Sequence, residues 1–322
     1  MDVAMGYALP RALHVVTEAG VPDALGDDPR PAADLAAATG TDAGALARML
    51  RLLAAHGLFE ACEGGFRHTE ASRLLRADHP FSMRPFVRLQ GLRSRWDIWG
   101  HLGHALRTGA TADRQALPEG WWAHLAAHPD DRAIFDEAMT KKVHAQIAGI
   151  LGACDFRRFG TIADIGGGQG HLLAAILDAA PAVRGILFDL PEVVGGVEPP
   201  QRLGGRLLVQ PGSFFEGPLP RADAYLLTQV LHNWDDEGCL RLLRGIREAA
   251  APGARLLAVE WLIPEDGRPN WTLLVDLIML AEYSGRERTE PELAALLSAS
   301  GFRLDRTVDC GLRSFILEGV AV

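Results

Sequence analysis

The chain has 322 residues, of which 48% are hydrophobic and 23% charged, so it can bury the core of one or two globular domains. Its formal net charge of −9 argues against nucleic acid or an anionic membrane as a partner. We expect a cytoplasmic protein, because the start of the chain lacks the basic and apolar stretches of a signal peptide and no apolar run is long enough to span a bilayer.

The first part of the chain has the pattern of a winged helix, in which short helices precede a hairpin. One helix, over residues 32–40, ends at a glycine, and Thr41 or Asp42 can cap the next. The dipeptide Glu63-Gly64 is typical of a hairpin turn. The other elements that this pattern predicts are a helix over 43–56 and strands over 58–62 and 65–69.

Charge decides between two uses of such a unit. Winged helices can bind DNA, but residues 1–80 hold eleven Asp and Glu against seven Arg and no Lys, which makes a poor reader of phosphate. A transcriptional regulator is therefore the less favoured interpretation. We expect these residues to join two chains as a homodimer, through apolar residues at helical spacing such as Leu9, Leu13 and Val16.

The pattern changes along the rest of the chain. Residues 81–150 are expected to be mostly helical, with an amphipathic helix over 130–149. From residue 161, strands alternate with helices, which predicts an α/β, Rossmann-like domain with a mostly parallel sheet and a ligand at the carboxyl ends of its strands. The expected strands are 161–165, 184–189, 207–209, 224–227 and 254–260. One expected helix begins at His171 and another covers 237–250. The predicted domains are 1–90 for dimerisation, 91–155 as a helical linker and 156–322 for catalysis.

A glycine-rich turn follows the first of these strands. The run Asp164-Ile165-Gly166-Gly167-Gly168-Gln169-Gly170 lets the backbone turn tightly and approach a ligand closely. It is not the dinucleotide-binding fingerprint G-x-G-x-x-G, because His171 occupies the last glycine position. Asp189 closes the second strand about twenty residues later, where an acid can accept hydrogen bonds from ribose hydroxyls, and we favour this role over that of a strand-end acid capping the turn before Pro191.

A histidine follows the fourth strand, at the same edge of the sheet. The segment Leu231-His232-Asn233-Trp234-Asp235-Asp236 resembles the catalytic segment of plant caffeate and flavonoid O-methyltransferases, which bacterial antibiotic-tailoring and hydroxyindole O-methyltransferases share. The glycine turn resembles motif I of methyltransferases that use S-adenosylmethionine (SAM). The resemblance covers nearly the whole chain, through the segments 35–40, 50–58, 276–280 and 285–289.

The resemblance implies SAM as the cofactor, S-adenosylhomocysteine (SAH) as its product, a small aromatic acceptor and no metal. It makes His232 the general base, flanked by Glu260 and Glu287. The residues implied for the cofactor are Asp164, Gly166, Gly168, Gly170, Asp189, Leu190, Ser213, Phe214, Thr228 and Trp234, with Phe214 and Trp234 enclosing the adenine. Those implied for the acceptor are Phe135, Met139, Asn233 and Met279, and plain core packing is nearly as good an explanation of the three apolar ones.

Elementary chemistry supports a histidine in this role. A phenol has a pKa near 10 and is a weak nucleophile while protonated, and an imidazole can take its proton as attack proceeds. A carboxylate on the other ring nitrogen would fix the tautomer, and either Glu260 or Glu287 could supply it.

Two positions depart from the family pattern. Asn233 replaces the usual Asp after the histidine, and Ser213 replaces an Asp before Phe214-Phe215. Asn233 keeps open a relative with other chemistry at the SAM site, such as N-methylation, hydroxylation, decarboxylation or a pericyclic reaction. His124 and His128 could share a helix face as a metal pair, but no third ligand is apparent and surface histidines are the preferred interpretation.

Overall fold

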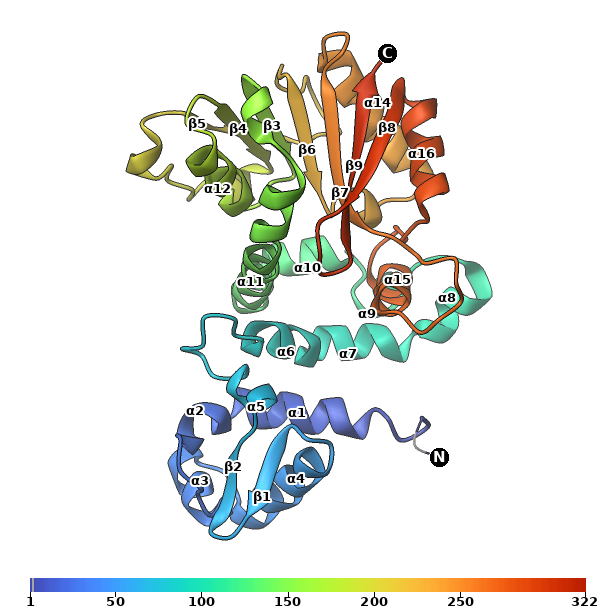
Figure 1. The fold of residues 1–322 in the computed structure, drawn as a ribbon. Helices are drawn as coiled ribbons and strands as arrows, with labels where there is room; N and C mark the ends of the chain where they lie inside the picture. Colours follow the sequence, from blue (N-terminus) through green and yellow to red (C-terminus); the bar gives the residue numbers. More distant parts are fainter. Residues whose placement is uncertain (2) are drawn as a thin grey trace. The chain divides into compact units, whose positions relative to one another are not determined.

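A computed structural model describes Met1 and residues 3–322. The chain divides into two compact units, one made of residues up to Gly100 with 122–142, and one made of residues 101–121 with 143–322 (Figure 1). The long helix α11 (Pro129–Ala153) contributes residues to both. The three-part division at residues 90 and 155 stays a prediction. None of the described helices is long and apolar enough to cross a membrane.

The first unit begins with the expected helices and hairpin. The helix α3 ends at Gly40 in a left-handed conformation, and Asp42 caps α4 by accepting the Ala45 N–H at 2.8 Å. The hairpin β1–β2 is antiparallel, with Phe59 opposite His68. The elements of this unit, besides its part of α11, are α1 (Ala8–Glu18), α2 (Val21–Leu25), α3 (Ala32–Thr39), α4 (Ala43–Ala55), β1 (Phe59–Cys62), β2 (Gly65–His68), α5 (Glu70–Arg73), α6 (Arg84–Gly91), α7 (Arg93–Gly100) and nearly all of α10 (Trp121–Ala127).

The apolar face of α1 is turned into the core of its own unit. Val16 is 1% exposed and packs in a cluster with residues of α2, α3 and α4, and Leu9 and Leu13 pack against the same cluster. Val16 therefore offers no surface to a partner, whereas Leu9 and Leu13 are only half-buried and their contact with a partner stays a prediction. Helical spacing of apolar residues marks a buried face, and it does not tell whether that face is covered by the same chain or by another.

The second unit contains the expected α/β sheet. Among the described residues the sheet has seven strands in the order β5-β4-β3-β6-β7-β9-β8, and the first five are parallel (Figure 1). The last two strands, which the sequence patterns did not predict, form an antiparallel pair, and β9 adds antiparallel to β7. The Rossmann-like fold with a mostly helical N-terminal unit is thus confirmed.

The bounds of the second unit follow the predicted pattern closely. Its elements, besides the end of α11, are α8 (Leu102–Thr108), α9 (Asp113–Ala116), η1 (Phe156–Arg158), β3 (Thr161–Ile165), α12 (His171–Ala179), β4 (Arg184–Asp189), α13 (Pro191–Val194), η2 (Gln201–Leu203), β5 (Leu207–Pro211), β6 (Ala224–Thr228), η3 (Leu231–Asn233), α14 (Asp236–Ala249), β7 (Arg255–Trp261), α15 (Trp271–Glu282), α16 (Glu290–Ala299), β8 (Phe302–Asp309) and β9 (Ser314–Ala321).

Both faces of the sheet are covered by helices. Successive strand residues point to opposite sides, so each strand contributes to both layers of packing. Ile162 and Leu226 pack with α12 and the end of α11, whereas Ala163 and Tyr225 pack on the other face with α14 and α16. These strands are buried on both faces, as parallel strands usually are. Because the five strands are parallel, the loops that follow them meet at one edge of the sheet. The residues predicted to carry the chemistry are found there.

Candidate active site

The glycine turn between β3 and α12 lies tightly on the strand before it. Gly166 has a φ of 72°, a left-handed conformation that glycine adopts without strain. A Cβ atom on Gly167 would lie 2.6 Å from the Asp164 carboxyl group and 2.6 Å from Leu187. Only a residue without a side chain fits so close to Asp164. The backbone of the turn is therefore free to approach a ligand.

Asp189 ties this turn to the neighbouring strand. Its Oδ2 accepts the Gly168 N–H at 2.8 Å, and its Oδ1 accepts the Leu190 N–H at 2.7 Å. Asp189 therefore caps the turn before Pro191 and also fixes the glycine turn. Each carboxylate oxygen can accept more than one hydrogen bond, so these contacts are compatible with ribose binding.

The surroundings of the turn fit the cofactor that the sequence implied. Three buried polar atoms, Asp164 Oδ1, Thr228 Oγ1 and Gln229 Nε2, have no hydrogen-bond partner among the described residues. Buried polar atoms normally have a hydrogen-bond partner, so unpaired polar atoms near the glycine turn are consistent with a polar ligand. Phe214 and Trp234 lie close together, with ring centroids 5.8 Å apart in an edge-to-face contact, and their role at the adenine stays a prediction.

His232 lies in the short turn η3 that follows β6, and a carboxylate orients its ring. Its Nδ1 is 2.7 Å from Glu287 Oε1, and the two side chains are 7% and 1% exposed. An ionised carboxylate only accepts hydrogen bonds, so Nδ1 carries the proton and Nε2 keeps its lone pair. This arrangement makes Nε2 a proton acceptor.

Glu260, at the end of β7, has a different task from Glu287. Its Oε1 accepts the Leu231 N–H at 2.9 Å, which fixes the residue before the histidine, and its Oε2 has no partner in the described part of the chain. Burial raises the pKa of Glu260 to about 7, although the nearby His232 lowers it. Of the two carboxylates that could have held the ring, the structure gives that contact to Glu287.

Known proteins resemble this chain along its whole length. A family model described as an O-methyltransferase domain matches residues 99–303, and one described as an O-methyltransferase dimerisation domain matches residues 1–78. The chain belongs to the O-methyltransferase family. This membership confirms the enzyme class, and SAM as its cofactor is supported by methyltransferase structures that contain it.

Three relatives show the range of the family. A mitomycin biosynthesis 6-O-methyltransferase of Streptomyces lavendulae is 39% identical, over 96% of this chain and 90% of its own. An 8-amino-8-demethylriboflavin N,N-dimethyltransferase of Streptomyces davaonensis is 38% identical, over 90% and 85%. The structure of an O-methyltransferase from neocarzinostatin biosynthesis, in complex with SAM and 2-hydroxy-5-methyl naphthoic acid, matches with a TM-score of 0.84 and 32% identity over 98% and 96% of the chains.

The two departures from the family pattern have local partners in this O-methyltransferase. Asn233 Nδ2 donates to the Gln229 carbonyl at 3.3 Å, within the turn that carries the histidine. Ser213 Oγ accepts the Phe215 N–H at 3.2 Å and so shapes the turn that presents the two phenylalanines. Both residues are held by the chain itself, and their contacts with a cofactor or acceptor stay predictions.

The predicted acceptor residues are divided between the two units. Phe135 and Met139 lie on the part of α11 that belongs to the first unit, and Phe135 contacts Trp122 edge to face. Met279 lies on α15 in the second unit. Their common role as a pocket lining stays a prediction.

The two histidines considered as a metal pair are engaged within the protein. His124 Nε2 lies 2.8 Å from Asp131 Oδ2, and His128 Nδ1 donates to the His124 carbonyl at 2.8 Å. No group of three or more potential metal ligands gathers in the described residues.

Sequence reasoning missed several residues that shape the site. Gln229 has a φ of 54°, which is uncommon outside glycine and often marks a functional site. A Cβ on Gly285 would lie 2.0 Å from the His232 carbonyl oxygen, so this glycine permits a close approach of two chain segments. Arg288 is buried beside the histidine turn. The only sequence signal for the last two was the run 285–289, which is typical of the family.

Proposed function

We propose that this O-methyltransferase transfers a methyl group from SAM to a hydroxyl, preferentially a phenolic one, on a small aromatic or polyketide-type metabolite. The observation that supports this most directly is the buried pair of His232 and Glu287, with 2.7 Å between Nδ1 and Oε1, after the strand next to the glycine turn. One relative is named for mitomycin biosynthesis and another as a phenazine O-methyltransferase, which favours an aromatic acceptor.

The chain's own residues move one proton in the reaction. SAM, when bound, supplies a methyl group on a positively charged sulfur. His232 Nε2 would accept the proton of the acceptor hydroxyl as the methyl group passes from sulfur to oxygen and SAH is released, and the ring would become a cation. Glu287 stabilises the cation and keeps the ring in the orientation that presents Nε2. Alignment of the acceptor oxygen with the methyl group lowers the barrier further.

We assign the cofactor to the edge where the loops meet. Asp189 would accept from the ribose hydroxyls, and Phe214 and Trp234 would enclose the adenine. The glycine turn would hold the methionine part, and the remaining residues proposed for the cofactor are Asp164, Leu190, Ser213 and Thr228. Phe135, Met139, Asn233 and Met279 would line the acceptor side. We further propose a homodimer in the cytoplasm and a reaction that needs no metal.

A second candidate is methylation of an amino nitrogen at the same site. The 38% identity to an N,N-dimethyltransferase favours it, because the same fold and a similar sequence then serve nitrogen. The two candidates differ in product: a methyl ether forms in one case and a methylamine in the other. Mass spectrometry of the product, with an aminophenol as acceptor, separates them.

The test of the base is the substitution His232→Ala, with His101→Ala as the control because His101 is an exposed histidine of the same unit. We expect His232→Ala to bind SAM with unchanged affinity in calorimetry while turnover falls by about two to four orders of magnitude. His101→Ala should match the wild type in both measurements. A His232→Ala variant that binds SAM and turns over at the wild-type rate would refute the base assignment.

A further inference from the structure

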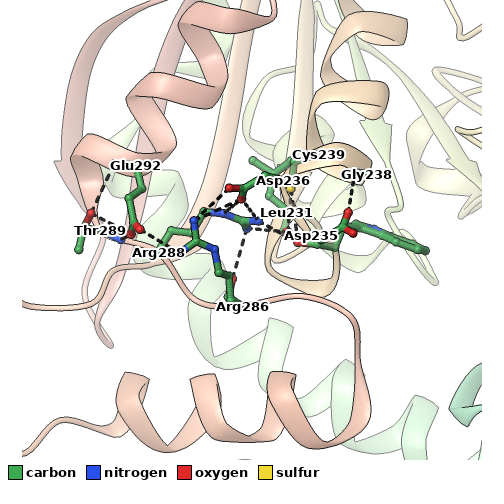
Figure 2. Close-up of polar contacts among 10 residues, drawn as sticks. Leu231, Asp235, Asp236, Gly238, Cys239, Arg286, Arg288, Thr289 and Glu292 are labelled. Carbon is green, nitrogen blue, oxygen red and sulfur yellow. Dashed lines mark hydrogen bonds and ion pairs between the residues drawn. The ribbon is translucent and has the colours of Figure 1, made fainter. Parts of the chain in front are cut away.

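A buried arginine holds the turn that carries the histidine. Arg288 directly follows Glu287, and its side chain is 1% exposed. Figure 2 shows its guanidinium between Leu231 and Asp236. In the chain, Leu231 precedes His232 and Asp236 follows it. We propose that Arg288 is a positioning residue for the transfer reaction, which fixes the His232 turn and the Glu287 carboxylate relative to each other.

The guanidinium reaches the chain on both sides of the histidine. Its Nη1 donates to the Leu231 carbonyl at 3.1 Å, and its Nη2 donates to the Trp234 carbonyl at 2.9 Å. The same Nη2 lies 2.8 Å from Asp236 Oδ1, and Nε donates to that oxygen at 3.0 Å. One side chain therefore fixes three points within six residues, and His232 lies between them.

Other contacts hold the same turn and leave it little freedom. Cys239 Sγ donates to the Leu231 carbonyl at 3.2 Å, and burial raises the pKa of this thiol to about 12, so it keeps its proton. Gly285 lies so close to the turn that a Cβ there would lie 2.0 Å from the His232 carbonyl oxygen. Arg288 completes this set of contacts from the segment that also carries Glu287.

The position requires an arginine rather than any cation. A guanidinium has five N–H donors in a rigid fork, whereas a lysine ammonium is a single point with three donors on a flexible stem. A lysine could pair with Asp236 but could not reach both carbonyls and the carboxylate with fixed geometry. Burying a cation is unfavourable unless its donors are satisfied, and here a carboxylate and backbone carbonyls satisfy them.

The neighbouring arginine provides a matched control. Arg286 lies two residues away, pairs with the same Asp236 at 3.1 Å and with Glu292 at 2.9 Å, and its side chain is 45% exposed. No hydrogen bond from Arg286 to the Leu231 or Trp234 carbonyl is found among the contacts of the described residues. Replacing either arginine by methionine removes one charge from Asp236, but only Arg288→Met frees the histidine turn.

The expected result is a selective loss of the chemical step. In Arg288→Met, we expect kcat to fall by about 10- to 100-fold, because small misplacements of a catalytic group are sufficient for such a loss. SAM affinity should stay unchanged in calorimetry. Arg288→Lys should lie between that variant and the wild type, and Arg286→Met should resemble the wild type.

This inference rests on the proposed role of His232, so the experiment includes a readout that needs no turnover. The hydrogen-bonded Nδ1 proton of His232 should give a downfield resonance in proton NMR of the SAH complex, assigned by its loss in His232→Ala. We expect this signal in the wild type and in Arg286→Met, and its loss or broadening in Arg288→Met. If His232→Ala turned over normally, the proposed role of His232 as the base would fail, but the resonance would still report on the Arg288 contacts.

Two outcomes would overturn the proposal. The first is an Arg288→Met variant that folds and keeps both the resonance and the kcat of Arg286→Met. The second is a variant whose melting temperature falls while the resonance and kcat persist, which would make Arg288 a structural residue only. If Arg288→Met does not fold, Arg288→Lys decides, and wild-type values of both readouts in that variant would refute the inference.

Discussion

Two buried carboxyl groups at the active edge of the sheet hold their protons more tightly than ordinary acids. Burial, and then the charge of Asp189, raises the pKa of Asp164 to about 7. Burial raises the pKa of Glu260 to a similar value. Neither carboxyl forms an ion pair within the described residues, so each is held in a position where the charged form is poorly solvated.

The raised pKa of Asp164 predicts how stability depends on pH in the absence of SAM. An unfolded Asp has a pKa near 3.9, so between about pH 4 and pH 7 the folded protein keeps a proton that the unfolded chain has released. Stability therefore falls as the pH rises through this window, by roughly 1.4 kcal/mol per unit at most, and the loss is complete above about pH 7.

The substitution Asp164→Asn removes this titration. Relative to the wild type, the free energy of unfolding of this variant should increase from about pH 4 to about pH 7 and then level off. Urea unfolding of the ligand-free proteins at each pH measures the difference. The control is Asp178→Asn, a surface carboxylate paired with Arg202. A difference between Asp164→Asn and the wild type that does not change with pH would contradict the prediction.

The connection from β3 to α12 shows how one element sets the geometry of the next. Because the backbone at Gly167 passes close to the Asp164 carboxyl and Leu187, even a methyl group must displace the turn. We expect Gly167→Ala to lower stability by about 1–3 kcal/mol, as overpacking does. SAM affinity should fall as well, because the turn can no longer keep its position beside Asp189.

Calorimetry with SAM and thermal melting test this prediction against Gly196→Ala. Gly196 lies in a loop of the same unit, and a Cβ there would meet nothing within 4 Å. The control should therefore bind SAM and melt as the wild type does. Equal SAM affinity for the two variants would show that the glycine turn does not hold the cofactor.

At the level of elements, the sequence predicted what local patterns determine. The five parallel strands, the glycine turn and the helix α4 each carry their signal within a few consecutive residues. The addition of β9 to β7 was not predicted, because it pairs residues more than fifty positions apart. Burial of Val16 was misjudged for a related reason: periodicity shows an apolar face but not what covers it.

The site shows the same limit. His232 and the two glutamates could be named from sequence, because their strand ends or family runs mark them. Which glutamate contacts the ring could not be known, since Glu287 is 55 residues from His232 along the chain. The same holds for Arg288, whose contact with Leu231 spans 57 residues. Such distant contacts appear only when the elements are packed.

At the scale of the whole molecule, the structure raises the question of what covers the apolar start of the chain. Val3 is 97% exposed and Tyr7 58% exposed in the single chain, and Met5 beside them is also exposed. The matched dimerisation model spans residues 1–78 and so includes these side chains. Since the face of α1 that carries Val16 is already covered, we expect this segment to contribute to the dimer contact instead.

The last prediction is that Met5→Glu combined with Tyr7→Glu weakens the homodimer. Two carboxylates in an apolar contact would lose their hydration without gaining a partner, and identical residues of both chains are altered at once by the symmetry of a homodimer. Light scattering after size exclusion should give about twice the chain mass of 34.7 kDa for the wild type at micromolar concentration, and a smaller mass for the double variant. Leu106→Glu is the control, because Leu106 is 87% exposed and lies outside the matched dimerisation region.

A monomeric wild type would refute the homodimer itself. A double variant that remains dimeric would place the interface elsewhere in the chain, since exposed apolar residues that tolerate two new charges cannot be buried against a partner.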